Sequence, residues 1–394
     1  MKVMFFGNCP WTTSGYSNNI RNIVLRLKKQ HEVAVQCNWG LTGGPVQWNG
    51  ITCYPTSTTS PDSARANFAE LEKNAKKWGA DISILHYDVW TNNDQLLTTT
   101  LPFMAYGTVD GYPVSPLIID GFKNARKVIS ANEWEKKVLK ADYDMDSVVI
   151  PYGIDPTIYY PATKDKEKYK QKFGVVEPFL FSAVGRNVGP RKGFAETMEA
   201  YGNFLAKNPS AVEDTRLYLH TDYMGAMGGY NLYNLCQLYG IAGNVTFTAS
   251  DSFESLTDDE VADLYRASDV LMNCSHGEGF GKPILEALAC GVPVIATDAT
   301  SMTELVKGHG QLVRPSGRVL QNQNYTYHAL PFVPDIVKAM ETYYRDWRSG
   351  GKLLKEHGDD GAKMAREKYN WDDINNKWVD MLKDYEEEVK KENK

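Results

Sequence analysis

Few cysteines occur in this sequence of 394 residues, and none of the six stands in a C-x-x-C pair. Their scarcity and scatter argue against a disulfide scaffold and a zinc knuckle, and favour reduced, buried thiols in a cytoplasmic protein. Basic residues are not in excess either, because 43 Lys and Arg face 49 Asp and Glu, a net charge of −6. A nucleic-acid-binding protein is normally basic, so no nucleic-acid partner is expected.

Long apolar runs are also missing. No stretch approaches the roughly 20 apolar residues that span a bilayer, and residues 1–7 are too short for the apolar region of a signal peptide. Basic helix faces, such as that of Lys136, Lys137 and Lys140, are expected to be solvated, with peripheral contact at the inner face of a membrane as the alternative. The composition is otherwise globular, with 42% apolar residues in a chain long enough for two cores.

Short apolar runs alternate with helical patterns in the first part of the chain. Residues 2–6 form an apolar run typical of a buried strand, and Ile20, Ile23 and Leu27 fall on one face of a helix expected at 16–29. Further strands are expected at 32–36, 81–85, 102–106, 127–130 and 147–150, and further helices at 63–78 and 133–140. This alternation predicts a parallel sheet with helices on both faces.

The alternation begins again after the hydrophilic stretch 161–172, which we interpret as a boundary. Strands are then expected at 179–184, 216–220, 244–248, 269–274 and 292–296, and helices at 194–207, 230–239, 284–290 and 371–391. A capping box, Thr257 to Glu260, predicts one more helix start. The sequence thus predicts an α/β protein of two doubly wound, Rossmann-like domains, 1–160 and 161–371. Their ligand would bind in the cleft that the two domains face across, at the carboxyl ends of the strands.

The most informative stretch is 275–293, SHGEGFGKPILEALACGVP, where a strand leads through a Gly-rich loop into a helix. Free backbone N–H groups and the positive end of the helix dipole favour a phosphate there, and glycine lets a ligand approach the backbone. The loop carries Glu278, and Glu286 lies about one turn into the helix. An ionised carboxylate only accepts hydrogen bonds, which suits sugar hydroxyls.

A second informative stretch, GRNVGPRKG at 185–193, directly follows a predicted strand. Its Arg186 and Lys192 are suited to neutralise a diphosphate, the arginine through a planar fork and the lysine as a point charge. A solvated basic loop is the alternative for this stretch taken alone. Both stretches, in this order within a second α/β domain, favour a site for a nucleoside diphosphate.

In combination these residues resemble the retaining glycosyltransferases of family GT4 (glycosyl transferases group 1), which have the GT-B fold and use nucleotide-sugar donors. Glu278 and Glu286 stand at the spacing of the family's E-x7-E motif, and Arg186 and Lys192 match its paired diphosphate cations. The stretch 151–161 is similar to the interdomain segment. Residues 368–371 and the helix after them resemble the C-terminal helix that crosses back to the first domain, assigned here to 372–394. The first domain resembles the family only in layout.

The resemblance implies roles for individual residues. Glu286 would hold the donor ribose, and Glu278 with the backbone of Phe280 and Gly281 would hold the transferred sugar. Arg186 and Lys192 would stabilise the departing diphosphate, which is normally the largest catalytic contribution. Further donor-binding residues implied are Gly15, Gly279 and Lys282. No cofactor and no metal ion are expected, because the family is generally metal-independent.

The acceptor side departs from the family. Many members carry a first-domain histidine in a pattern like F-H-T, whereas the corresponding stretch 105–111, AYGTVDG, has none. Asp110 is the charged group in this stretch and is a candidate to orient sugar hydroxyls or assist the acceptor, with a turn-forming Asp before Gly111 as the alternative. His86, at the end of a predicted strand, is a second acceptor-side candidate.

Three other signals have ordinary explanations. The D-x-D pattern within 142–146 binds a metal in another glycosyltransferase fold, but its position among the elements favours a polar loop. Cys274 invites a role as nucleophile, yet its loop is better explained by donor binding. His220 follows a strand, and a structural role is expected first.

The sequence therefore predicts an enzyme that moves a hexose from a UDP- or GDP-sugar to a hydroxyl of a glycan, glycolipid or other acceptor, with retained anomeric configuration. A nucleotide-sugar 2-epimerase of the same fold and a non-catalytic, sugar-nucleotide-binding partner subunit are the alternatives. A nicotinamide dehydrogenase is disfavoured because no G-x-G-x-x-G follows the first strand. The acceptor pocket is expected in first-domain loops at 39–49 and 54–61. Oligomeric state is not indicated.

Overall fold

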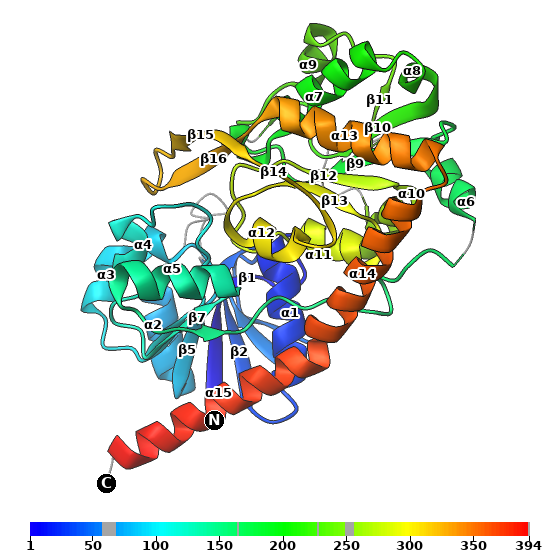
Figure 1. Ribbon diagram of the computed structural model, residues 1–394. Coiled ribbons are helices and arrows are strands. Elements are labelled where there is room, and N and C mark those ends of the chain that lie inside the picture. The colour runs from blue at the N-terminus through cyan, green and yellow to red at the C-terminus, as the bar shows by residue number, and fades with distance from the viewer. Residues whose placement is uncertain (57–67, 164, 227, 249–255, 393–394) are drawn as a thin grey trace.

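The computed structural model of the chain describes residues 1–56, 68–163, 165–226, 228–248 and 256–392. It contains two large sheets, each with helices packed against it, and the two sheets lie in separate halves of the molecule (Figure 1). The first half holds the N-terminus, and the second half is built from the middle of the chain. The final helix returns to the first half.

The first sheet has eight strands in the order β3-β4-β2-β1-β5-β6-β7-β8. Its strands are β1 (Lys2–Asn8), β2 (Glu32–Trp39), β3 (Val46–Trp48), β4 (Ile51–Tyr54), β5 (Ile82–Leu85), β6 (Phe103–Ala105), β7 (Lys127–Ser130) and β8 (Val148–Val149). Its helices are α1 (Gly15–Leu27), α2 (Phe68–Trp78), α3 (Asn93–Thr98), α4 (Pro116–Asp120) and α5 (Glu133–Tyr143), with a 3-10 turn at Val89–Asn92. Residues 57–67, which include the expected start of α2, lie outside the described residues.

One expectation for this sheet was wrong. The stretch 39–49 is not only a loop, because it contains β3, which pairs antiparallel with β4 at the edge of an otherwise parallel sheet. β3 is largely exposed. An edge strand open to solvent needs no apolar run, so the sequence gives little sign of it.

The second sheet has six parallel strands in the order β11-β10-β9-β12-β13-β14. They are β9 (Phe179–Val184), β10 (Thr215–His220), β11 (Val245–Phe247), β12 (Val270–Asn273), β13 (Val294–Thr297) and β14 (Gly310–Val313). The helices are α6 (Lys166–Lys172), α7 (Phe194–Lys207), α8 (Ala211–Asp214), α9 (Leu232–Leu238), α10 (Asp258–Ala267), α11 (Lys282–Ala289), α12 (Thr300–Val306), α13 (Val333–Arg348) and α14 (Lys352–Lys368). The predicted capping box is present at the start of α10.

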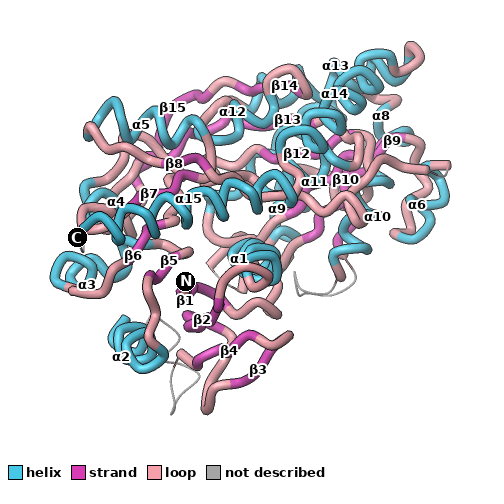
Figure 2. Tube along the Cα trace, turned by 90° about the horizontal axis from the view of Figure 1, so that it is seen from below, coloured by secondary structure: helices cyan, strands magenta, loops and turns pink. Residues whose placement is uncertain are grey.

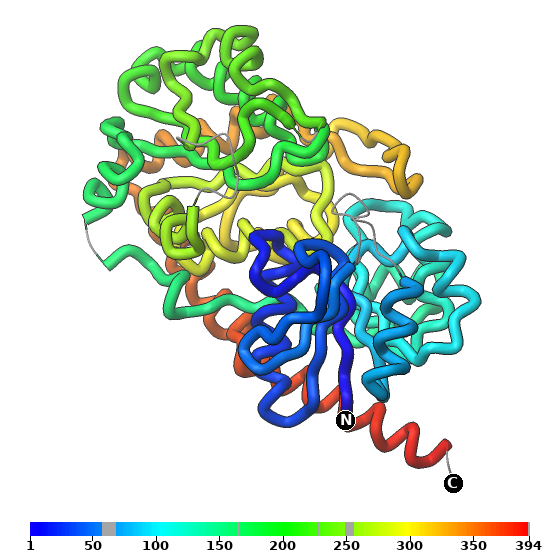
Figure 3. Tube along the Cα trace, turned by 180° about the vertical axis from the view of Figure 1, so that it is seen from behind, coloured from blue at the N-terminus to red at the C-terminus, as the bar shows by residue number. Residues whose placement is uncertain are grey.

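An antiparallel hairpin, β15 (Pro315–Leu320) and β16 (Tyr327–Pro331), extends from the second half and was not predicted. β15 is exposed along most of its length, so its sequence lacks the apolar alternation of a half-buried strand. Two views show the hairpin reaching over the part of the first half that contains α4 (Figures 1 and 3).

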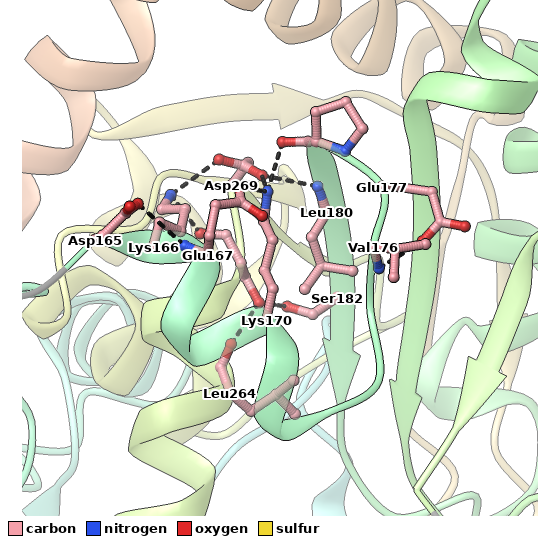
Figure 4. Close-up of polar contacts among 12 residues, drawn as sticks. Asp165, Lys166, Glu167, Lys170, Val176, Glu177, Leu180, Ser182, Leu264 and Asp269 are labelled. Carbon is pink, nitrogen blue, oxygen red and sulfur yellow. Dashed lines mark hydrogen bonds and ion pairs between the residues drawn. The ribbon is translucent and has the colours of Figure 1, made fainter.

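The hydrophilic stretch 161–172 is not a solvated linker throughout, because its second part is α6. The side chain of Lys170 is buried, its Nζ lies 3.4 Å from Oδ2 of Asp269, and it donates to the carbonyl of Pro178 (Figure 4). Lys166 donates to Oδ1 of Asp269 at 2.9 Å, and the backbone N–H of Leu180 donates to Oδ2 at 2.7 Å. Paired charges therefore join α6 to the second sheet, as a buried lysine requires.

The last helix, α15 (Trp371–Glu392), crosses back to the first sheet, as expected (Figure 2). Trp378 is buried there, with its ring 5.8 Å from that of Phe5 and 5.4 Å from that of Tyr106. Near the end of the helix, Glu388 forms an ion pair with Lys127 at 2.6 Å. One apolar cluster runs from the core beside α1 and α15 to the core beside α10 and α11, so the two halves share a continuous core.

Candidate active site in the interdomain cleft

A cleft of about 1250 Å³ lies between the two halves. Its first wall consists of the loop after β1, the start of α1, and the loops after β5 and β6. Its second wall consists of the loops after β9 and β12, the start of α10, and the tip of the β15–β16 hairpin. Loops that follow parallel strands meet at the carboxyl edge of each sheet, where ligands of doubly wound folds bind.

The Gly-rich loop after β12 delivers the start of α11 to this cleft. Gly281 has a left-handed φ of 87°, and Pro283 occupies the first turn of the helix. No side chain caps this helix start, and the positive end of the helix dipole favours an anion there. Gly279 lies close to the opposite wall, since a Cβ there would come within 2.4 Å of Cβ of Thr108.

Two cationic side chains of this wall lie beside the carboxylate of Glu278. Its side chain is buried, and its Oε1 accepts hydrogen bonds from Nζ of Lys192 at 2.6 Å and from Oγ of Ser275 at 2.7 Å. Nη1 of Arg191 lies 3.5 Å from its Oε2. Burial alone would raise the pKa of Glu278, but the two cations and the hydrogen bonds hold it below its usual value. Glu278 is therefore ionised in a positive setting.

Arg191 is a site residue that the sequence analysis missed. Besides contacting Glu278, its guanidinium donates to the carbonyl of Gly277 at 2.9 Å and lies 3.7 Å from Oδ2 of Asp110 in the first half. The turn that carries Arg191 packs tightly against the loop after β12, because a Cβ at Gly193 would come within 1.9 Å of the carbonyl oxygen of Cys274. The R-K pair before a glycine was the available signal. Arg186, the predicted cation, also lines the cleft.

Glu286 and Lys282 interact with each other on the first turns of α11. Nζ of Lys282 donates to Oε1 of Glu286, and the hydroxyl of Tyr265 donates to Oε2 at 2.9 Å. Both residues line the cleft, together with Phe280 and Gly281. The ring of Phe280 stacks on that of Tyr152, with centroids 4.7 Å apart, so it anchors the loop against the first half.

The opposite wall is acidic. Gly15 begins α1 beside open space, since a Cβ there would meet no atom of the described residues within 4 Å. Next to it, the hydroxyl of Tyr16 donates to Oδ1 of Asp88 at 3.0 Å. Asp88 is accessible within the cleft, but the surrounding protein and the charge of Asp110 raise its pKa, against the hydrogen bond from Tyr16.

Asp110 is held from the second half. Nε2 of His328, on β16, lies 3.1 Å from its Oδ1, and Arg191 lies near its other oxygen. Burial opposes ionisation, yet these contacts lower the pKa of Asp110. A histidine thus contacts the candidate acceptor-side residue after all, but it comes from the hairpin and not from the first half.

His86 is not an acceptor-side group in this structure. Its ring has no exposed surface: Nε2 lies 3.0 Å from Nδ2 of Asn19, Nδ1 lies 3.1 Å from the carbonyl oxygen of Tyr106, and the ring stacks on that of Tyr106. Burial lowers the pKa of His86 to about 4. The strand end that suggested a functional position is covered by α1, so His86 has a structural role.

The signals with ordinary explanations fit the structure. Burial raises the pKa of Cys274 to about 12, which is unsuited to a nucleophile at neutral pH. Nδ1 of His220 bonds Oγ1 of Thr248 at 2.8 Å. In the D-x-D stretch, Asp144 and Asp146 are exposed and pair with Lys140. Throughout the described ranges, no group of three or more His, Cys, Asp or Glu side chains is arranged to hold a metal ion.

Comparison with known proteins places these loops in a family context. Residues 178–323, which include the loops after β9 and β12 and the strand β15, match the family model of glycosyl transferases group 1. This part of the chain is therefore similar to family GT4. The part of the chain that the structure describes has no helix of the length and apolar character needed to cross a membrane.

Curated relatives match part of this chain. A D-inositol 3-phosphate glycosyltransferase of Stackebrandtia nassauensis is 32% identical over 176 residues, 43% of this chain and 38% of the relative. A mannosylfructose-phosphate synthase of Agrobacterium fabrum is 26% identical over 272 residues, 64% of this chain and 52% of the relative. The chain thus spans about half or less of the length of these curated relatives.

Solved structures establish the GT-B fold across the whole chain. The sucrose-phosphate synthase of Thermosynechococcus elongatus superposes with a TM-score of 0.76 at 17% identity, covering 98% of this chain and 99% of that structure. Anabaena HepE in complex with UDP-glucose gives a TM-score of 0.71 at 17% identity, covering 98% and 100%. The chain therefore shares both domains of this fold.

Proposed function

We propose that this protein transfers a hexose from a nucleoside diphosphate sugar to an acceptor hydroxyl with retained anomeric configuration and without a metal ion. The observation that carries the proposal is the convergence of Lys192 and Arg191 on the single carboxylate of Glu278, beside the uncapped start of α11. On the second wall these two cations exceed the one carboxylate, and a diphosphate would compete with Asp110 of the opposite wall for Arg191. The UDP-glucose bound by HepE, a protein of the same fold, agrees with this donor class.

The arrangement suggests how the groups would act. The diphosphate would lie at the start of α11, where backbone N–H groups and the helix dipole favour negative charge. Lys192, Arg186 and Arg191 would stabilise the charge that builds on it as its bond to the sugar breaks. Glu286 would accept from ribose hydroxyls, for which it must exchange its present contacts with Tyr265 and Lys282.

Transfer would take place on one face of the sugar. The acceptor oxygen bonds to the anomeric carbon as the bond from that carbon to the diphosphate oxygen breaks. The electron pair leaves with the diphosphate, and the acceptor proton passes to a phosphate oxygen. Glu278 would hold the sugar hydroxyls, and Asp110 would orient the acceptor from the other wall.

The first experiment is thermal unfolding with UDP-, GDP-, ADP- and dTDP-sugars, each with and without EDTA. A donor at about 100 times its Kd stabilises the fold by roughly 2.7 kcal/mol. We expect one base to give this stabilisation unchanged by EDTA. No stabilisation by any donor would contradict the proposal. Incubation of UDP-GlcNAc alone, followed by NMR, separates transfer from 2-epimerisation, and binding without turnover would indicate a partner subunit.

A cytoplasmic location is part of the proposal. All six cysteines are free thiols with buried side chains. Persisting free thiols fit a reducing compartment. Mass spectrometry of the protein isolated under acid quench, with alkylation of free thiols, should find all six unpaired. A disulfide in the native protein would contradict this location.

A further inference from the structure

The tip of the β15–β16 hairpin adds a wall of amide side chains to the cleft. Four consecutive amide residues, Gln321 to Asn324, line the cleft at this tip. The match to the GT4 family model ends at residue 323, so the returning strand β16 lies beyond it. The tip therefore differs from the donor-binding loops in its chemistry.

The hairpin is fixed to the first half by its own backbone. The N–H of Tyr112 donates to the carbonyl of Tyr327 at 2.9 Å, and the hydroxyl of Thr326 donates to the carbonyl of Pro113 at 2.9 Å. Gly111 permits the approach, because a Cβ there would come within 2.4 Å of the carbonyl oxygen of Tyr327. These contacts follow Asp110 directly, so the hairpin and the acceptor-side wall are joined (Figures 1 and 3).

The same contacts keep the amides in a defined position. Asn324 is buried, and its Oδ1 accepts from the N–H of Thr326 at 3.2 Å, which stabilises the turn. Asn322 and Gln323 are exposed and line the cleft. An amide offers both donors and an acceptor, so it can bind a hydroxyl in either role.

The first half supplies complementary groups to this space. Asp88 and Asp110 add carboxylates, and Trp90 adds an aromatic ring, all on the cleft surface. Two cations on the cleft surface already form ion pairs. Arg191 contacts Asp110 and Glu278, and Arg21 pairs with Asp258 at 2.8 Å. Amides, carboxylates and a ring suit a ligand rich in hydroxyls. Arg191 balances the charge of Asp110, whereas the carboxylate of Asp88 disfavours an anion beside it.

We propose that the hairpin tip, through Asn322 and Gln323, forms an acceptor subsite together with Asp88 and Trp90, and that this subsite takes an uncharged glycan in preference to a sugar phosphate. The inference rests on the proposed transferase function, because it names the acceptor class for that reaction. It assigns the choice of acceptor to an element of the donor domain that reaches across the cleft.

The experiment measures binding of acceptors, so that it does not depend on turnover. Saturation-transfer NMR is recorded with the full chain plus the nucleoside diphosphate that stabilises it, using maltose, cellobiose and lactose against glucose 6-phosphate and fructose 6-phosphate. We expect a neutral disaccharide to bind more tightly than either phosphate. The double variant Asn322→Ala/Gln323→Ala should weaken that binding about tenfold, since two hydrogen bonds are lost.

Two further variants sharpen the result. Leu320→Ala changes an exposed side chain on the hairpin stem and should leave acceptor binding unchanged. Asn322→Lys should raise the affinity for glucose 6-phosphate relative to the disaccharide. All three variants should keep the stabilisation by the donor, which reports on the proposed function separately. Tighter binding of a sugar phosphate by the unaltered chain, no binding of any neutral glycan, or equal affinities in the double variant would overturn the inference.

Discussion

The carboxylates on the two walls of the cleft have different surroundings. On the second-domain wall, Glu278 lies between two cations, which lower its pKa despite burial. On the first-domain wall, the surrounding protein and the charge of Asp110 raise the pKa of Asp88, whereas the pKa of Asp110 is lowered, despite burial, by His328 and Arg191 from the second half. A wall with surplus positive charge suits a diphosphate, and a wall with crowded carboxylates suits neutral hydroxyls. This difference supports the proposed division of the cleft into a donor side and an acceptor side.

The donor side depends most on Lys192, so its removal should have the largest effect. We expect Lys192→Ala to lower kcat by about 10² to 10³, the usual cost of one lost group that stabilises developing charge. Single-turnover kinetics with the donor found by thermal unfolding measures this. Lys355→Ala, at an exposed position on α14, is the matched control and should keep the normal rate. A Lys192→Ala variant with unaltered kcat would show that this lysine does not act on the leaving group.

Two glycines, one on each wall, should respond differently to an added methyl group. Gly193 has a φ of 64° and no space for a Cβ, so Gly193→Ala should destabilise the protein by about 3 kcal/mol, from backbone strain and overpacking. Gly15 begins α1 beside open space, so Gly15→Ala should leave the unfolding midpoint unchanged and raise the KM for the donor instead. Urea unfolding and donor kinetics on both variants test this. A loss of stability only in Gly15→Ala would reverse the comparison.

The pH dependence of stability should separate the walls as well. The folded-state pKa of Glu278 is lowered, so its contribution is present above the ordinary glutamate pKa of about 4.3 and is lost as the pH falls through the folded value. The folded-state pKa of Asp88 is raised, so its ionisation at pH 7 opposes folding. We expect Glu278→Gln to destabilise the protein at pH 7 and Asp88→Asn to stabilise it. Urea unfolding between pH 3.5 and 7 measures both, and equal signs would refute the assignment of the walls.

The sequence predicted elements best where burial alone decides them. The bounds of β7, β9 and α7 match the expectation to the residue. β9 is buried throughout and β7 over three consecutive residues, so both read as short apolar runs, and α7 buries one helix face. The two antiparallel hairpins were not predicted, because β3 and β15 are exposed edge strands without such a pattern.

Candidate site residues could be predicted where a local sequence motif marks them. Glu278 and Lys192 are near each other in the folded chain, and both stand in recognisable loops beside strand ends. Arg191 and His328 become visible only through partners far away in sequence, because both contact Asp110 across the cleft. His86 was misjudged because the sequence does not show that α1 covers the end of its strand.

The smallest effect is expected away from both walls, at the D-x-D stretch. Asp144 and Asp146 are about nine-tenths exposed, and their partner Lys140 is also at the surface. Exposed ion pairs of this kind contribute little to stability. Asp144→Asn should therefore change neither the unfolding midpoint nor the transfer rate, and EDTA should have the same negligible effect on the variant and on the unaltered chain. Transfer that falls in Asp144→Asn and is restored by added Mn²⁺ would show that a metal acts outside the two-walled cleft, and the charge-based division of the site would then be incomplete.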